Sequence, residues 1–178
     1  MHKDVESVLI SQEKLENIVK SLAKQIEKDY NGREFIMVGL LKGSVVFMAD
    51  LMKRIDLDFE IDFMVVSSYG CGTESSGEVK ILKDLSVSPA GRDILIVEDV
   101  VDSGRTLSFI IERLKNAGAA SVKVCTLCDK PSRRKFPFVP DYCGAEVPDE
   151  FIIGYGLDYN EKYRNLPYIG VLKRSVYS

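Results

Sequence analysis

Apolar residues along this chain recur in two patterns, one typical of helices and one typical of buried strands. Between Ser11 and Tyr30 they return every three or four positions, which predicts an amphipathic helix with Ser11 as its N-cap. The runs at 35–39 and 94–97 are continuously apolar, as in strands that helices cover on both faces, and 122–127 also has the pattern of a strand. These runs therefore predict the interior strands of a parallel sheet.

Further segments complete an alternation of strands and helices. The pattern predicts helices over about 43–54 and from Thr106 onward, and strands at 55–65 and 79–82. In 55–65 apolar residues alternate with mostly acidic ones, which is typical of a half-exposed strand. The glycine- and serine-rich residues 69–77 predict a loop. Strands that alternate with helices predict an α/β fold with an open, mainly parallel sheet flanked by helices.

The length of the chain suits one domain, and we expect a single domain over 1–178. Its core is expected over about 11–129, where the pattern of strands and helices is regular. Beyond Lys130 the pattern weakens into segments that contain Pro and Gly. We therefore expect the N-terminal residues and about 130–178 to form a small hood over the ligand site.

The most informative stretch of the chain runs from Ile94 to Thr106. It joins a buried strand to a turn-prone segment and then to the first turn of a predicted helix. Glu98 and Asp99 directly follow the apolar run, and Asp102 lies in the turn. Ligands of open parallel sheets bind beyond the carboxyl ends of the strands, so these acids mark a candidate site.

The turn after these acids has a composition that suits an anion. A helix N-terminus presents free N–H groups, and glycine and hydroxyl-bearing residues let a phosphate approach them. Glu98 and Asp99 suit sugar hydroxyls or Mg²⁺, and Asp102 could face the reacting end of a sugar. The whole arrangement favours a sugar phosphate over an ordinary solvated and capped turn. The anion-binding residues would be Ser103, Gly104, Arg105 and Thr106.

This stretch resembles the signature of the type I phosphoribosyltransferases, which bind phosphoribosyl pyrophosphate. The resemblance implies that Glu98 and Asp99 contact the ribose and the metal-bound substrate. It also implies that residues 102–106 wrap the 5′-phosphate and that Asp102 is the general base proposed for purine-using members. Arg105 departs from the lysine of many relatives, which keeps the charge but could change the geometry at the phosphate.

Two other segments extend the resemblance. Lys42 and Gly43 lie in a stretch similar to the family's pyrophosphate loop, and Arg164 is placed to reach the same pyrophosphate. Ser68 and Tyr69 resemble the start of the mobile loop that closes over the site. The resemblance also implies Mg²⁺ as the cofactor, with three metal ligands: Glu98, Asp99 and Asp158.

The C-terminal part of the chain resembles specifically the hypoxanthine and hypoxanthine–guanine members of the family. Lys130 falls where these enzymes carry the lysine that contacts the exocyclic oxygen of a 6-oxopurine. Phe151 and Ile152 match the pair that stacks on the base and reads it through main-chain groups, and Asp158 would be a metal or purine ligand. The resemblance implies a Mg²⁺-dependent purine salvage enzyme that makes IMP or GMP and pyrophosphate.

Three other interpretations stay open. A regulatory module of the same fold would bind phosphoribosyl pyrophosphate without turnover, but such a protein usually carries an added nucleic-acid-binding segment or a basic face. A phospho-receiver domain also places acids after a strand, but that strand opens the domain, whereas Asp99 lies past the middle of this chain. A phosphoribosyltransferase for xanthine, adenine or a pyrimidine would need another base site, and Lys130, Phe151 and Asp158 favour a 6-oxopurine.

Composition limits the partners of this chain. A net charge of −3 and a pI near 5.3 disfavour nucleic-acid binding, and the basic run 133–135 is interpreted as a solvated loop. No apolar run approaches about 18 residues, so we expect no membrane span. The first residues lead into no signal peptide, so we expect a cytoplasmic enzyme. The family resemblance implies a homodimer or homotetramer.

Other motifs do not support a competing chemistry. Cys125 and Cys128 have the spacing of a metal or redox pair, but on a strand they would point to opposite faces. The single histidine, His2, is near the start, which disfavours Ser–His or Cys–His catalysis and leaves a carboxylate, lysine or tyrosine as the general base. The glycines of 72–77 have P-loop spacing without its lysine, and 154–156 is an incomplete dinucleotide motif.

Overall fold

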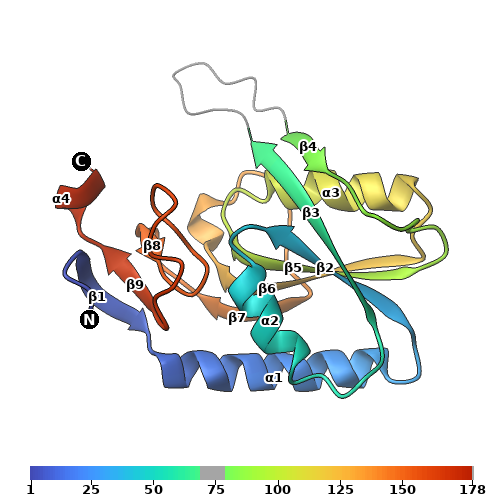
Figure 1. Ribbon diagram of the computed structural model, residues 1–178. Coiled ribbons are helices and arrows are strands. Elements are labelled where there is room, and N and C mark those ends of the chain that lie inside the picture. Colours follow the sequence, from blue (N-terminus) through green and yellow to red (C-terminus); the bar gives the residue numbers. More distant parts are fainter. Residues whose placement is uncertain (69–78, 178) are drawn as a thin grey trace.

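The computed structural model describes residues 1–68 and 79–177, which form two β-sheets and their flanking helices (Figure 1). The larger sheet has six strands in the order β4-β3-β2-β5-β6-β7, and the smaller one has three in the order β1-β9-β8. The strands are β1 (Val5–Ile10), β2 (Phe35–Leu41), β3 (Glu60–Ser68), β4 (Val79–Lys83), β5 (Asp93–Val101), β6 (Ser121–Asp129), β7 (Tyr142–Glu146), β8 (Ile152–Ile153) and β9 (Ile169–Leu172). The helices are α1 (Gln12–Tyr30), α2 (Val45–Met52), α3 (Arg105–Asn116), the 3₁₀ turn η1 (Pro131–Arg133) and α4 (Arg174–Tyr177).

The six-stranded sheet is parallel except at one edge. Strands β3, β2, β5, β6 and β7 run in the same direction, and β4 pairs antiparallel with β3. This confirms the predicted open, mainly parallel sheet. The chain adds strands toward one edge after β2 and toward the other edge after β5, so the strand order reverses between β2 and β5. In doubly wound sheets ligands bind at this reversal, beyond the carboxyl ends of the strands.

The central strand β5 shows why the sheet needs continuous apolar runs. Leu95 and Val97 pack in the cluster that contains α1 and α2, whereas Ile94 and Ile96 pack in the cluster that contains α3. Each of these side chains is fully buried. Successive side chains of a strand point to opposite faces, so a strand covered on both sides has no position left for a polar residue. Burial of each such side chain contributes about 1.5–3 kcal/mol.

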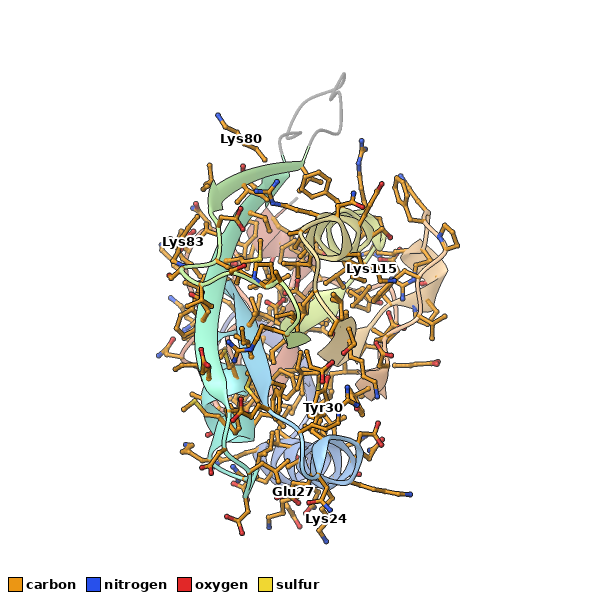
Figure 2. All side chains as sticks on the ribbon, turned by 90° about the vertical axis from the view of Figure 1, so that its right-hand side faces the viewer. Lys24, Glu27, Tyr30, Lys80, Lys83 and Lys115 are labelled. Carbon is orange, nitrogen blue, oxygen red and sulfur yellow. The ribbon has the colours of Figure 1, made fainter. Side chains whose placement is uncertain are left out.

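Helix α1 follows directly from its sequence pattern. The hydroxyl oxygen of Ser11 accepts a hydrogen bond from the main-chain N–H of Lys14 at 3.3 Å, so Ser11 caps the helix as predicted. Lys24 and Glu27 lie on the outer side of the helix, away from the sheet (Figure 2). The helix buries its apolar stripe against the sheet, with side chains from Leu15, Val19, Leu22, Ala23, Ile26 and Tyr30.

Strand β3 begins and ends later than the strand predicted over 55–65, and its faces differ from the prediction. The acidic residues were expected at the solvent, but Asp62 is buried and Ile61 is exposed. Asp62 accepts hydrogen bonds from the main-chain N–H of Ser86 at 2.6 Å and from the ammonium of Lys83 at 3.1 Å. Burial opposes ionisation of Asp62, but these and a further main-chain donor hold its pKa below the ordinary value.

The three-stranded sheet joins the two ends of the chain. β1 pairs antiparallel with β9, with Val5 opposite Leu172 and Ile10 opposite Ile169. β9 then pairs with β8, and Figure 1 shows both termini beside this sheet. Periodicity did not predict these strands, because β8 has two residues, β9 has four, and β1 is buried only at its two ends. The N-terminal residues and part of the segment expected to form the hood thus share one sheet.

One helix differs from its predicted bounds, and one predicted loop is not described. Helix α2 begins at Val45 and ends at Met52, so the helix predicted over 43–54 was too long at both ends. The loop predicted over 69–77, with its P-loop-like glycines, falls outside the described residues. Within the ranges that the structure describes, no helix combines the length and the apolar character that a membrane crossing needs.

Candidate active site

The loop after β2 meets the carboxyl end of β5 where the strand order of the larger sheet reverses. The loop after β2 contains Lys42 and Gly43, and the end of β5 carries Glu98 and Asp99. A Cβ atom on Gly43 would lie 1.7 Å from Oδ2 of Asp99, so a side chain at this position would collide with the carboxylate. The peptide bond between Leu41 and Lys42 is cis. The structure thus brings the predicted pyrophosphate loop against the predicted sugar- and metal-binding acids.

Glu98 and Asp99 form a partly buried pair of neighbouring carboxyl groups. The main-chain N–H of Asp99 donates to Oε1 of Glu98 at 3.1 Å, and that of Val100 donates to Oδ1 of Asp99 at 2.8 Å. Burial and the neighbouring Asp99 carboxylate raise the pKa of Glu98 well above its ordinary value, and burial also raises the pKa of Asp99. Two like charges held together in this way are stabilised by a nearby cation.

This pair of carboxylates fits Mg²⁺ when a substrate supplies further oxygens. Mg²⁺ is usually held by one or two protein carboxylates together with substrate phosphates and water. Across residues 1–68 and 79–177, no group of three or more His, Cys, Asp or Glu side chains converges as a metal site. Asp158, the third predicted ligand, pairs with Arg164 at 2.9 Å. Its role as a metal ligand stays a prediction.

The turn after β5 leads into α3 through a left-handed residue. Gly104 has a φ of +79°, a conformation that glycine adopts without steric cost. Helix α3 begins at Arg105, one residue earlier than predicted, and the main-chain N–H of Arg105 donates to Oγ of Ser103 at 3.4 Å. Residues 102–106 therefore place a helix N-terminus at the carboxyl end of β5, which is an arrangement that binds phosphate.

A buried lysine lies beside Asp102. The Lys130 side chain is 6% exposed, and its ammonium nitrogen lies 3.8 Å from Oδ1 of Asp102. It also donates a hydrogen bond at 2.8 Å to the main-chain carbonyl of Glu150. An ammonium group loses hydration when it is buried, so these partners are needed to hold it in place. The predicted purine-binding lysine and the predicted general base are thus neighbours.

A pocket of about 410 Å³ opens beside this lysine. Phe151, which is 37% exposed, contributes to its wall. The Phe151 ring centroid lies 5.1 Å from that of Tyr177 and 5.3 Å from that of Tyr159. The Ile152 side chain belongs to the hydrophobic core, and the predicted contact of its main chain with a base stays a prediction. The pocket is also lined by Asp99, Asp102, Lys130, Glu150, Leu157 and Asp158.

Lys42 and Arg164, the predicted pyrophosphate-binding residues, share one carboxylate. Oε2 of Glu161 lies 3.1 Å from Nζ of Lys42 and 3.3 Å from Nη2 of Arg164. Hydrogen bonds from these two cations lower the pKa of Glu161. Arg164 also pairs with Asp158 and donates to the main-chain carbonyl of Gly156 at 2.8 Å. The structure therefore brings together two predicted cations that are far apart in the sequence.

The basic run 133–135 was interpreted as a solvated loop, and this is wrong for Arg134. The Arg134 guanidinium forms an ion pair with the buried Asp129 and donates a hydrogen bond at 2.7 Å to the main-chain carbonyl of Asp102. Its two neighbours in the run are exposed. Charge and periodicity carried no signal for this contact, because it depends on how the chain turns after β6.

The predicted closing loop follows β3, and the C-terminal helix α4 forms part of the pocket wall. Ser68 is the last residue of β3, and Tyr69 lies outside the described residues, so the role of this loop stays a prediction. Tyr177 lines the pocket beside Phe151 and was missed. Its contribution could not be read from the local sequence, since α4 reaches the pocket through the smaller sheet.

Cys125 and Cys128 lie in the hydrophobic core. Burial raises the pKa of Cys128 to about 12 and also raises that of Cys125. The thiolate is the form that binds metals and attacks substrates. Because burial keeps these two thiols protonated, it disfavours both chemistries. These side chains contribute to packing.

The sequence matches the family described as phosphoribosyl transferase domain over residues 8–160. The matched range contains both loops at the strand reversal, the turn at 102–106 and much of the pocket. The chain therefore belongs to the phosphoribosyl transferase family. This confirms the resemblance inferred from its motifs.

Individual relatives are similar over the whole of this chain. The hypoxanthine-guanine phosphoribosyltransferase of Staphylococcus epidermidis is 55% identical over 178 residues, which are 100% of this chain and 99% of the relative. A crystal structure of a hypoxanthine phosphoribosyltransferase from Staphylococcus aureus has a TM-score of 0.96 and 53% identity, covering 100% of this chain and 97% of that one. A bifunctional TilS/HprT protein of Listeria innocua is 55% identical, but this chain spans 28% of its length.

Proposed function

We propose that this chain transfers the phosphoribosyl group of phosphoribosyl pyrophosphate to hypoxanthine or guanine, forming IMP or GMP and pyrophosphate. The observation that carries the proposal is the buried Lys130, which lies 3.8 Å from Asp102 in a pocket bordered by Phe151. Membership in the phosphoribosyl transferase family and whole-chain similarity to the Staphylococcus enzymes support it. The substrates are phosphoribosyl pyrophosphate and a 6-oxopurine.

The choice of base follows from the hydrogen-bonding chemistry of Lys130. An ammonium group only donates hydrogen bonds, so its partner on the base must be an acceptor. The 6-oxygen of hypoxanthine or guanine meets this requirement, whereas the 6-amino group of adenine places one donor against another. Because Lys130 is buried, water does not relieve that mismatch. Phe151 offers an exposed aromatic face on which the base can stack.

We assign the proton transfer to Asp102. Its carboxylate lines the base pocket, and its main chain belongs to the turn that holds the 5′-phosphate. It therefore lies between the two substrates at the point where the purine N9 bonds to C1′ of the ribose. The carboxylate accepts the proton that the purine loses at N7. The ammonium nitrogen of Lys130 lies 3.8 Å from Oδ1 of Asp102, so the base pocket holds the predicted proton acceptor beside the predicted donor to the 6-oxygen.

The pyrophosphate leaves toward Lys42 and Arg164. These cations lie together around Glu161, and Lys42 belongs to the loop whose Gly43 packs closely against the Asp99 carboxylate. Positive charge that is already in place favours a transition state in which the leaving group gains negative charge. When bound by the Glu98 and Asp99 carboxylates, Mg²⁺ would neutralise part of the charge on the pyrophosphate.

A side-by-side assay tests this proposal. The chain is incubated with phosphoribosyl pyrophosphate, MgCl₂ and one base at a time: hypoxanthine, guanine, xanthine or adenine. We expect rapid formation of the hypoxanthine or guanine nucleotide, little product from adenine, and loss of turnover when EDTA removes the metal. Transfer to adenine at a similar rate would contradict the role of Lys130. Binding of phosphoribosyl pyrophosphate without turnover of any base would favour a regulatory module of the same fold.

The assembly of the chain can be checked on the same preparation. We propose a homodimer or homotetramer from the family resemblance, and no binding of nucleic acid because the net charge is −3. Sedimentation at several concentrations measures the oligomeric state, and a mobility-shift assay with RNA and DNA measures nucleic-acid binding. A shifted RNA or DNA band would contradict the second expectation.

A further inference from the structure

Arg134 connects the segment after β6 to the turn after β5. Its Nη1 donates a hydrogen bond at 2.7 Å to the main-chain carbonyl of Asp102, and its Nη2 forms an ion pair with the carboxylate of Asp129. The guanidinium carbon lies 5.7 Å from the ring centroid of Phe138, within the range of a cation–π contact. The planar fork of a single arginine thus spans two separate elements.

Main-chain hydrogen bonds join the same two segments beside Arg134. The N–H groups of residues 135–136 both donate to the carbonyl of Ser103 at 3.0 Å. The N–H of Lys130 donates to the carbonyl of Val101 at 2.9 Å. Among the three consecutive carbonyls at 101–103, that of Asp102 is the one held by a side chain. It can therefore be released by substitution without changing the main chain.

The ion pair between Arg134 and Asp129 is mostly shielded from water. The two side chains are 15% and 10% exposed. The N–H of Val147 donates to the carbonyl of Asp129 at 2.8 Å, which ties this end of the pair to the chain that follows β7. Without its cation, the buried Asp129 carboxylate would lack a counter-charge, which is unfavourable. The ion pair therefore holds the Arg134 guanidinium in one position. Arg134 therefore attaches the turn after β5 to a well-packed part of the sheet.

We propose that Arg134 is a positioning residue for the 5′-phosphate turn at 102–106. The inference rests on the proposed function and extends it, because it assigns to a residue outside the turn the placement of the phosphate-binding N–H groups. The turn also packs on the arginine, since a Cβ on Gly104 would lie 3.1 Å from Cδ of Arg134. Arg134 acts through the Asp102 carbonyl and touches neither the sugar nor the base.

The test compares Arg134→Met with a matched control, Arg33→Met. Arg33 pairs with Asp93 at the amino end of β5 at 2.6 Å and lies 5.6 Å from the ring of Tyr30, so its contacts are of the same kind. It makes them at the end of the strand that is remote from the phosphate turn. Calorimetry gives the Kd for ribose 5-phosphate, and steady-state kinetics give KM for phosphoribosyl pyrophosphate and for hypoxanthine.

We expect Arg134→Met to raise both the Kd for ribose 5-phosphate and the KM for phosphoribosyl pyrophosphate about tenfold, the loss expected for one charge-assisted hydrogen bond. The KM for hypoxanthine should stay near that of the wild type, and Arg33→Met should match the wild type in all three constants. Wild-type values for Arg134→Met would overturn the proposal. A lower kcat with unchanged KM values would also overturn it, because that result indicates a smaller folded fraction.

If Arg134→Met does not fold, Arg134→Lys replaces it as the test variant. A lysine keeps the charge opposite Asp129, but its ammonium lacks the planar fork that reaches both partners, so KM for phosphoribosyl pyrophosphate should rise about threefold. A wild-type KM in Arg134→Lys would overturn the bridging role. The two proposals also fail separately: if the wild type binds ribose 5-phosphate but forms no nucleotide, the proposed function fails, and the binding comparison still decides the role of Arg134.

Discussion

Two groups of charged side chains in the candidate site differ in their exposure to water. The pyrophosphate cluster consists of Lys42, Asp158, Glu161 and Arg164. Its outer members, Lys42 and Glu161, are 67% and 64% exposed. In the other group, the side chains of Lys130 and Arg134 are 6% and 15% exposed. This base cluster consists of Asp102, Asp129, Lys130 and Arg134.

This difference indicates which contacts give way when a substrate binds. Exposed ion pairs contribute little to stability because water and salt screen them, so a pyrophosphate can replace Glu161 as the partner of Lys42 and Arg164. Removing one partner of a buried pair costs about 3–5 kcal/mol, so Arg134 and Asp129 of the base cluster keep their geometry. One cluster therefore supplies cations to a leaving group, and the other holds the base site and the phosphate turn in fixed positions.

The largest effect is expected in the base cluster, from Asp102→Asn. Asparagine keeps the size of the side chain and the main-chain carbonyl that Arg134 holds, but it is a poor proton acceptor. We expect kcat for hypoxanthine to fall by about 10²–10⁴, the usual contribution of a general base. The Kd for ribose 5-phosphate should change little. An unchanged kcat would remove Asp102 from proton transfer.

In the pyrophosphate cluster, Arg164→Met should have the next largest effect. The substitution removes a cation that we place on the leaving group, and we expect kcat/KM for phosphoribosyl pyrophosphate to fall by about 10²–10³. Lys162→Met is the control, because Lys162 is an exposed cation two residues away. Equal activity of the two variants would show that Arg164 acts only as a surface charge.

Glu98→Gln tests the repulsion between the neighbouring carboxylates of Glu98 and Asp99 at the end of β5. Burial and the Asp99 carboxylate raise the pKa of Glu98 in the folded protein, so its ionisation opposes folding. This penalty is absent below the unfolded pKa of about 4.3 and grows as the pH rises toward the folded pKa. Glu98→Gln should therefore raise the free energy of unfolding at pH 8 and leave it unchanged at pH 4.

Urea unfolding at the two pH values measures this difference. The exposed Glu112→Gln is the control, and it should leave the stability unchanged at both pH values. A gain for Glu98→Gln that is the same at pH 4 and pH 8 would contradict the charge explanation, because Glu98 is already protonated at the lower pH.

The smallest effect is expected from Glu161→Gln. The glutamine no longer competes with pyrophosphate for Lys42 and Arg164, so KM for phosphoribosyl pyrophosphate should fall by no more than about twofold. The melting temperature should not change, and added salt should reduce the difference in KM. A large loss of activity would show that Glu161 holds the cations in position, and the contrast between the clusters would then not hold.

Segments whose burial repeats with a fixed period were predictable from the sequence. The interior strand at 94–97 is apolar at every position because helices cover both faces of the sheet, and α1 is apolar on one stripe because one side faces the sheet. The turn at 102–106 was also predictable as a helix N-terminus, since its residues are contiguous. Local patterns record local burial, so they place these elements within a few residues.

Features that depend on distant partners were not predictable in this way. Asp62 has the alternation of an exposed residue, yet it is buried because Lys83 and Ser86 donate hydrogen bonds to it. Strands β1 and β9 come from opposite ends of the chain and show no period, because β1 is buried only at Val5 and Ile10 and β9 has four residues. Arg134 lies in a run that looks solvated, and its partner carbonyl belongs to Asp102, 32 residues earlier.

The order of strands and helices is encoded locally in the sequence. So is the chemistry of one contiguous stretch, 98–106, in which acids, a glycine turn and a helix start follow a buried strand. Which cation meets which carboxylate depends instead on how the chain folds. Lys42 reaches Glu161 across 119 residues, and Lys130 lies beside Asp102, because the strand order reverses between β2 and β5 and brings distant loops to one place. An ion pair has no period along the chain, so its partners are known only once the fold is formed.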